Sequence, residues 1–189
     1  MSYINATTAV NRVKLVIVKA SDASVDGNGN ISPIETDFYS AASNTTGAIT
    51  TVANGAIVIP GLQDVTVNNA NGSFRWKQLD QSGENVITTN ATNSLSGNFV
   101  LDPTTFWGSG GTSPFDAGED GIFKLSNDRT EVAFLIAPSG ITDGNTILLG
   151  TGFISALAPT VSADSPVWVS PITIEVNGDY KKAVAAVAA

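Results

Sequence analysis

The stretch from Thr146 to Tyr180, TILLGTGFISALAPTVSADSPVWVSPITIEVNGDY, contains two runs that are typical of β-strands. The first run, Ile147–Leu157, is largely apolar, and the second, Val167–Val176, alternates apolar and polar residues. The apolar residues of the second run change from odd to even positions at Pro171. A bulge, or a strand that crosses from one sheet to another, would explain this change. Both runs are therefore predicted to be strands of a β-sheet.

Strand patterns also occur through the rest of the chain. The Asn-rich segment Asn68–Gly72 predicts a turn between two of these strands. A single helix is expected at about Ser113–Asn127, because Ser113 can cap it and Pro114 suits its first position. The remaining strands are expected at Val13–Lys19, Ile57–Ile59, Val65–Asn68, Phe74–Leu79, Asn85–Thr89, Leu95–Leu101 and Glu131–Ala137.

These elements predict one mostly-β domain over residues 1–189, either a β-sandwich or a partly closed β-barrel with one flanking helix. A polar segment, residues 20–60, is expected to be a long early loop insertion with little structure of its own. An N-terminal arm (1–9) and a C-terminal tail (181–189) flank the domain, and the tail is expected to be a frayed helix or an arm.

The composition excludes most enzyme chemistry. The 189 residues include no histidine and no cysteine, so neither a Ser-His-Asp nor a Cys-His site can be built, and zinc and iron lose their usual ligands. The net charge of −8 argues against a protein that grips nucleic acid. The N-terminus lacks the pattern of a signal peptide, and no apolar run is long enough for a membrane helix. We expect a non-enzymatic protein without a cofactor.

One loop resembles an EF-hand calcium site. In Ser24–Glu35, Asp26 and Asn28 fall on the third and fifth ligand positions and Glu35 on the twelfth, with Asn30 between them. Two features weaken the match, because the first ligand is Ser24 and a strand precedes the loop. The alternative is an ordinary turn loop rich in Asn, Asp and Gly.

Binding of a sugar is a second possibility. Trp76, Trp107 and Trp168 could line a carbohydrate surface, although aromatic residues more often pack in cores or subunit interfaces. A glycosidase would need two paired carboxylates. Glu84 and Glu175 are the acids expected nearest to strands, but nothing marks them as a pair.

The order of elements in the second half carries a family resemblance. A strand (Leu95–Leu101) is followed by Asp-Pro, a helix and Asn127-Asp-Arg129, and then by a strand (Glu131–Ala137). The strand Gly150-Thr-Gly-Phe-Ile-Ser-Ala-Leu157 and a small-residue loop lead into the final strand, which ends at Val176-Asn-Gly. This order resembles the major tail tube proteins of long-tailed bacteriophages, in the lambda major-tail-protein-like group. The resemblance covers roughly Leu95–Asp179.

The resemblance implies subunits that form hexameric rings, which stack into a hollow tube with an acidic lumen. It implies as partners other copies of the chain, the tape-measure protein, tail terminator and baseplate proteins and, in a contractile tail, a sheath protein. DNA would pass through without sequence-specific binding. The location would be the virion tail, assembled in the host bacterial cytoplasm without a membrane.

Six residues are candidates for contacts between subunits under this interpretation. The segment around residues 40–60 would be a ring-to-ring contact, with the two ends of the chain as further contacts. Two other classes stay open, a non-catalytic carbohydrate-binding β-sandwich and a decoration or baseplate protein of a virion. The candidate contact residues are Ile4, Gly47, Gly55, Ile57, Ile59 and Trp168.

Overall fold

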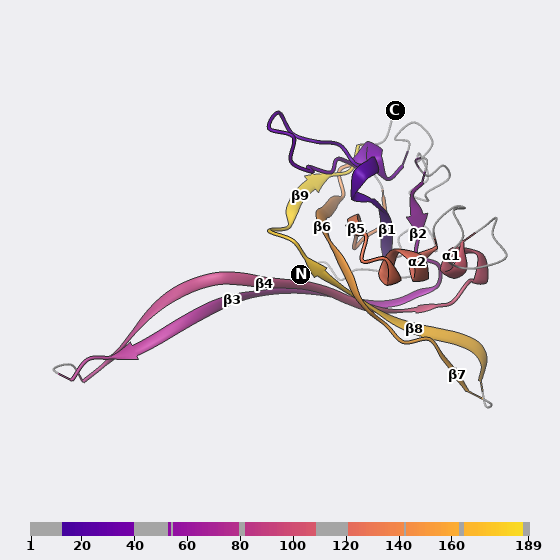
Figure 1. Cartoon of the computed structure of the whole chain (residues 1–189). Helices are drawn as coiled ribbons and strands as arrows, with labels where there is room; N and C mark the ends of the chain where they lie inside the picture. Colours follow the sequence, from indigo (N-terminus) through magenta and orange to yellow (C-terminus); the bar gives the residue numbers. More distant parts are fainter. Residues whose placement is uncertain are drawn as a thin grey trace.

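The computed structural model describes residues 13–39, 53, 55–79, 82–108, 121–141, 143–162 and 165–186. Within these ranges nine strands form one antiparallel sheet that does not close, and a two-stranded ribbon runs far out from the compact body (Figure 1). The order along the sheet is β2-β1-β5-β6-β8-β4-β3, with β9 paired to β6 and β7 paired to β8. The strands are β1 (Lys14–Lys19), β2 (Ile57–Val58), β3 (Leu62–Lys77), β4 (Glu84–Val100), β5 (Glu131–Ala137), β6 (Thr146–Leu157), β7 (Thr160–Ser162), β8 (Ser165–Val176) and β9 (Lys181–Val184).

The mostly-β prediction is confirmed, and β5, β6 and β8 lie within two residues of where the sequence placed them. The strands join into one continuous open sheet. The ends of this sheet path are the short strand β2 and the long strand β3.

The body has apolar side chains on both faces of its central strands. On one face, Leu15, Ile17 and Phe134 pack with residues of the helices and of β4 and β8. On the other face, Val16 and Leu135 pack against Phe38 and Tyr39, and both aromatic residues are fully buried. A strand covered on both sides has a continuous apolar run, which explains why Leu15–Val18 is apolar throughout.

Strand β8 holds the body and the ribbon together. Its last residues pair with β6, from Gly152 to Leu157, and the same part of β8 pairs with β4 from Ser94 to Val100. At Gly152 the two backbones come very close, because a Cβ added there would lie 2.2 Å from the carbonyl oxygen of Glu175. Position 152 of β6 must therefore be glycine.

Two short helices cover the face of the sheet that carries Leu15, Ile17 and Phe134. Helix α1 (Pro103–Trp107) is a helix that the sequence analysis missed, and Asp102 caps it by accepting a hydrogen bond from the Thr105 amide at 2.9 Å. Helix α2 (Ile122–Asn127) occupies the end of the predicted Ser113–Asn127 helix, while residues 113–120 lie outside the described residues. Helix α2 has Gly121 as its N-cap, without a side-chain hydrogen bond, and the predicted start at Ser113 is not tested by the described residues.

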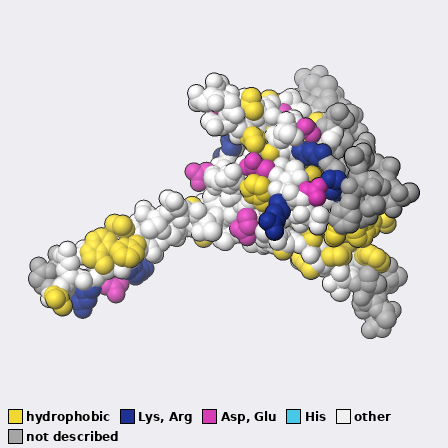
Figure 2. Space-filling model, viewed as in Figure 1, with side chains coloured by type: hydrophobic (Ala, Val, Ile, Leu, Met, Phe, Trp, Pro, Cys, Tyr) yellow, Lys and Arg dark blue, Asp and Glu magenta, His cyan; other side chains and the backbone are white. Residues whose placement is uncertain are grey.

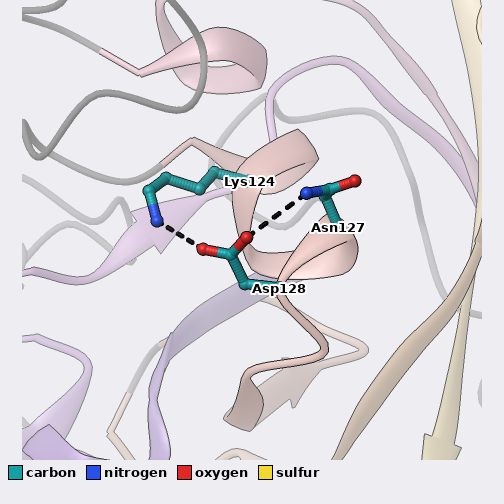
Figure 3. Close-up of polar contacts among 3 residues, drawn as sticks. All are labelled: Lys124, Asn127 and Asp128. Atoms are coloured by element: carbon teal, nitrogen blue, oxygen red, sulfur yellow. Dashed lines mark hydrogen bonds and ion pairs between the residues drawn. The ribbon is translucent and has the colours of Figure 1, made fainter.

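Helix α2 ends in a polar cluster at the surface. Lys124 and Asp128 form an ion pair one turn apart, and the Asn127 side chain donates to the other oxygen of Asp128 at 3.3 Å (Figure 3). The hydrogen bond from Lys124 is the main reason why the pKa of Asp128 lies below its ordinary value of 3.8. Arg129 follows with a φ of 53°, the left-handed conformation that commonly ends a helix.

Three other expectations are wrong in detail. The turn expected at Asn68–Gly72 is absent, because β3 runs through this segment and pairs with β4 along its length. The tail is not a helix at its start, since Lys181–Val184 forms β9 along β6. Neither the bulge nor the crossing between sheets expected at Pro171 is found, because Pro171 pairs in register with Asn98 of β4 within one sheet, and the register shift lies in β6 between Ile154 and Ala156.

The early insertion is more ordered than its composition suggests. It contains the short 3₁₀-helices η2 (Ala20–Asp22) and η3 (Glu35–Asp37) and the strand β2. Phe38 and Tyr39 follow η3 directly and fill one side of the core. Residues 40–52 and 54 lie outside the described residues.

Replacing Gly152 tests the close approach of β6 and β8. We expect Gly152→Ala to lower the free energy of unfolding by about 3 kcal/mol, because the backbone of one strand must move to admit a methyl group. The melting temperature measured by circular dichroism should then fall by roughly 6–12 °C for a chain of this size. Gly27→Ala is the matched control, since nothing lies within 4 Å of a Cβ at that position. Equal melting temperatures for the two variants would contradict the contact.

Candidate functional site

The ribbon is the part of β3 and β4 that extends beyond the rest of the sheet. Strand β8 pairs with β4 only between Ser94 and Val100, so from Asn93 back to Glu84 the ribbon consists of β3 and β4 alone. It projects from one side of the body, opposite to the hairpin of β7 and β8 (Figure 1). A two-stranded ribbon in water has little stability of its own, so the length of this one points to a role outside the subunit.

The end of the ribbon carries an apolar patch on one face. Phe74 pairs directly with Ile87 across the two strands, and the rings of Phe74 and Trp76 stack with centroids 6.0 Å apart. All three side chains are partly exposed, Phe74 by 55%, Ile87 by 51% and Trp76 by 36%. Figure 2 shows hydrophobic side chains gathered near the end of the ribbon. We call Phe74, Trp76 and Ile87 the tip patch.

The tip patch does not continue the core-facing side of β3. Near the body, Val65 of β3 packs against the core. The register of the ribbon shifts between Asn71 and Gly72, but the extra residue is Asn90 in β4, so the side chains of β3 continue to alternate. The even positions Phe74 and Trp76 therefore lie on the face opposite to that of Val65. The odd face at the tip is charged, with Arg75 3.7 Å from Glu84. The apolar side chains at the tip are therefore not needed by the core of the subunit.

The turn after β8 anchors the root of the ribbon. The Tyr180 hydroxyl lies 2.7 Å from the carbonyl oxygen of Ser94 in β4 and 3.1 Å from that of Asn68 in β3. The side-chain amide of Asn93 donates a hydrogen bond to the backbone carbonyl of Gly178 at 2.9 Å, and this asparagine is only 4% exposed. Burial, and then the negative charge of Glu175, raise the pKa of the Tyr180 phenol above its ordinary value of 10.0.

A groove lies at the other end of β4. Its volume is about 340 Å³, and we call it the Trp groove. Trp107, in α1, is held by Phe106 and Phe123, with ring centroids 4.8 and 5.0 Å away. Trp168 is 44% exposed, and its carbonyl accepts a hydrogen bond from the Leu101 amide at 2.9 Å. The residues that line the groove are Leu101, Pro103, Trp107, Val167 and Trp168.

An acidic group lies beside the groove. Asp102 stands between two residues of the lining and accepts hydrogen bonds from the amide and the hydroxyl of Thr105, both at 2.9 Å. These hydrogen bonds hold the pKa of Asp102 below its ordinary value of 3.8, so the carboxylate is charged near neutral pH.

The predicted calcium loop is arranged as a turn. The Asp26 side chain accepts hydrogen bonds from the backbone amides of Asn30 and Asn28, at 2.9 and 2.8 Å, and these lower its pKa, that of Asn30 the most. Glu35 accepts instead from the Tyr39 hydroxyl and the Ala186 amide. In the described ranges no cluster of three or more acidic, His or Cys residues could hold a metal ion. Calcium binding stays a prediction.

The predicted contact residues lie in different environments. Ile4 and Gly47 are outside the described residues. Gly55 is exposed, with a φ of 78°, and Ile57 pairs with Ile17 across β2 and β1. Ile59 is 4% exposed and belongs to the core of the subunit itself. Trp168 lies on the surface and lines the groove.

The three tryptophans do not form one surface. Trp107 and Trp168 meet in the groove, whereas Trp76 lies at the far end of the ribbon. Sequence reasoning missed the tip patch, because it treated Phe74–Leu79 and Asn85–Thr89 as two ordinary short strands. The available signal was the alternation of Phe74 and Trp76 with Arg75 and Lys77, which marks a strand with one apolar face. Sugar binding stays a prediction.

Comparisons with known proteins place the fold. No family model matches the chain, and no curated protein does. Among solved structures, the SPP1 tail tube matches with a TM-score of 0.53 and 12% identity, over 94% of this chain and 78% of that chain. The chain shares its fold with a tail tube protein. The tail of an empty GTA particle matches at a TM-score of 0.49, with 12% identity over 74% of this chain and 90% of that one. The baseplate of the anti-feeding prophage (AFP) matches with a TM-score of 0.44 and 10% identity, over 97% of this chain and 98% of that chain.

The tail-tube resemblance in the sequence is thus confirmed at the level of the fold, while assignment to the lambda-like group stays a prediction. No helix in the described part of the chain is long and apolar enough to cross a membrane.

Removing the Tyr180 hydroxyl tests the anchor of the ribbon. We expect Tyr180→Phe to lower the free energy of unfolding by about 1 kcal/mol, the usual net value of a hydrogen bond. Amide hydrogen exchange near Asn68 and Ser94 should become faster, while exchange in β5 should not change.

The pH dependence of stability provides a second readout. Because the folded pKa of Tyr180 is raised above the ordinary 10.0, its contribution is complete below pH 10 and is lost as the pH rises through the folded pKa. Tyr180→Phe should therefore lose less stability above pH 10 than the unsubstituted chain. An unchanged alkaline profile would show that the hydroxyl is not held as described.

Proposed function

We propose that this protein is a structural component of a phage tail and that its copies polymerise into the tail tube. The observation that carries the proposal is the fold shared with the SPP1 tail tube over 94% of this chain. Because the identity is 12%, the likeness supports a common architecture, and the surfaces of this chain must supply the argument for assembly.

Those surfaces support self-association. Strand β3 lies at the end of the sheet path, so among the described residues its 16 residues pair with a strand on one side only, that of β4. Such an edge is a template for pairing with another chain. The exposed tip patch and Trp groove add apolar area that the subunit does not bury. A monomer with these features would tend to aggregate, whereas a closed assembly can cover them.

The proposed assembly is a stack of hexameric rings around a lumen through which the genome leaves the capsid. The net charge of −8 supports an inner wall that repels phosphate and lets DNA slide without sequence-specific contacts. The partners would be the tape-measure protein inside, terminator and baseplate proteins at the two ends and, in a contractile tail, a sheath outside. The protein would act in the virion, after assembly in the bacterial cytoplasm. No catalytic step or cofactor forms part of the proposal.

Electron microscopy of the purified protein tests this function directly. We expect hollow tubes of uniform diameter in negative stain, and the polymerised fraction should grow with protein concentration. It should also grow with salt, because raising the ionic strength from about 0.1 M to about 1 M shortens the screening length from roughly 10 Å to roughly 3 Å and weakens repulsion between acidic subunits.

Two other results would contradict the tube. Monomers at every protein and salt concentration would argue against self-assembly. Rings or trimers that never stack would indicate a decoration or baseplate component instead.

A further inference from the structure

We propose that the tip patch of one subunit binds in the Trp groove of the next subunit. This inference rests on the proposed self-assembly and names the surfaces that make one of its contacts. The tip patch is Phe74, Trp76 and Ile87, and the groove is the site between Leu101, Trp107 and Trp168.

The two surfaces of one chain cannot meet each other. Trp76 pairs with Asn85, whereas the groove begins at Leu101, just past the end of β4. These 16 residues of continuous strand span about 50 Å, at roughly 3.3 Å per residue. Strand β4 pairs with β3 along this length. The ribbon is therefore held extended, and its tip cannot reach the groove of the same chain. Any contact between tip and groove must join two molecules.

The chemistry of the two surfaces matches. The tip carries two stacked aromatic rings, and the described residues that line the groove are two tryptophans, a leucine, a valine and a proline. Aromatic residues that enter an apolar pocket provide much of the energy of protein interfaces. Both surfaces are positioned within the subunit, because Trp107 packs against Phe106 and Phe123 and the tip patch lies on the paired strands β3 and β4.

The charged residues of the tip lie outside the proposed contact. Arg75 and Lys77 are on the face of the ribbon opposite to Phe74 and Trp76, and Arg75 is 3.7 Å from Glu84. The surface that the tip offers to the groove is therefore apolar, like the lining of the groove. A second copy of the chain fits the groove in its apolar chemistry.

The contact has a direction. Since the tip and the groove are different surfaces, each subunit gives one ribbon and accepts one, and such head-to-tail contacts produce closed rings or helical filaments. A contact between two tips would be symmetric and would stop at a dimer. The ribbon would also limit the spacing of neighbours, because the docked tip lies about 50 Å from the groove of its own subunit.

Two double variants separate the surfaces. The tip variant is Phe74→Ser with Trp76→Ser, and the groove variant is Val167→Ser with Trp168→Ser. All four side chains are at least 36% exposed, so both proteins should fold, which circular dichroism would verify. Val86→Ser is the control for the tip, because this valine is 51% exposed on the opposite face of the same ribbon. Phe153→Ser, at an exposed site outside the groove, is the control for the groove.

The first readout is the protein concentration at which assembly begins, measured by light scattering. We expect each double variant to raise it roughly a hundredfold, the effect of losing two aromatic or apolar anchors from an interface. The controls should assemble at the concentration of the unsubstituted protein. Phe74→Tyr with Trp76→Tyr should restore most of the assembly, because the apolar rings remain.

The second readout is a mixture of the tip and groove variants. The tip variant keeps its groove and the groove variant keeps its tip, so the mixture has one functional contact and should form a 1:1 heterodimer in analytical ultracentrifugation. The mixture is measured at a protein concentration at which neither variant associates alone, so that contacts outside the tip and the groove do not contribute.

The inference is overturned if the tip variant assembles like the unsubstituted protein or if the mixture contains no heterodimer. Loss of assembly in the groove variant alone would mean that another segment or ligand fills the groove, and would also overturn it. Failure of the proposed function is distinct, because it requires that the unsubstituted protein forms no tubes.

Discussion

The structure depends on the pairing of β8 with two neighbours at once. Residues 169–176 of this strand complete the sheet of the body through β6 and hold β4 through seven consecutive pairs, Ser94–Val100. The same contact requires Gly152, where the carbonyl of Glu175 leaves no room for a side chain. If β8 did not lie between β6 and β4, the ribbon would have no fixed direction relative to the core. The turn that follows β8 strengthens this junction through Tyr180 and Asn93.

The molecule divides its apolar residues between two tasks. Those of β1, β5 and β6 lie in the core, on both faces of the central strands. Those at the tip and in the Trp groove stay partly exposed, at opposite ends of the same strand β4. A soluble protein rarely keeps such patches without a partner. Their position explains how a small subunit can reach a neighbour without giving up any part of its own core.

Local patterns in the sequence predicted the strands that are buried. Glu131–Ala137 was located at its actual bounds, and β6 and β8 within two residues, because burial imposes a clear apolar pattern. The short strands β7 and β9 were not predicted. The ribbon was not predicted, because its middle contains Asn, Thr and Gly, which are typical of turns. There the strand is maintained by pairing with β4, and such pairing depends on a partner that no local pattern reveals. Similarly, Asp102-Pro103 was taken as a strand end although it also begins α1.

The sequence by itself determined the mostly-β class, the absence of histidine and cysteine chemistry, the acidic charge and the resemblance to tail tube proteins. These follow from composition and from the order of strands, which do not require knowledge of which segments meet. Only the tertiary structure decided that Phe74 and Trp76 lie on an outer face, that Trp107 and Trp168 share a groove, and that Ile59 is internal. Each of these depends on contacts between residues far apart in the chain, and the geometry of such contacts is set by the packing of the whole sheet.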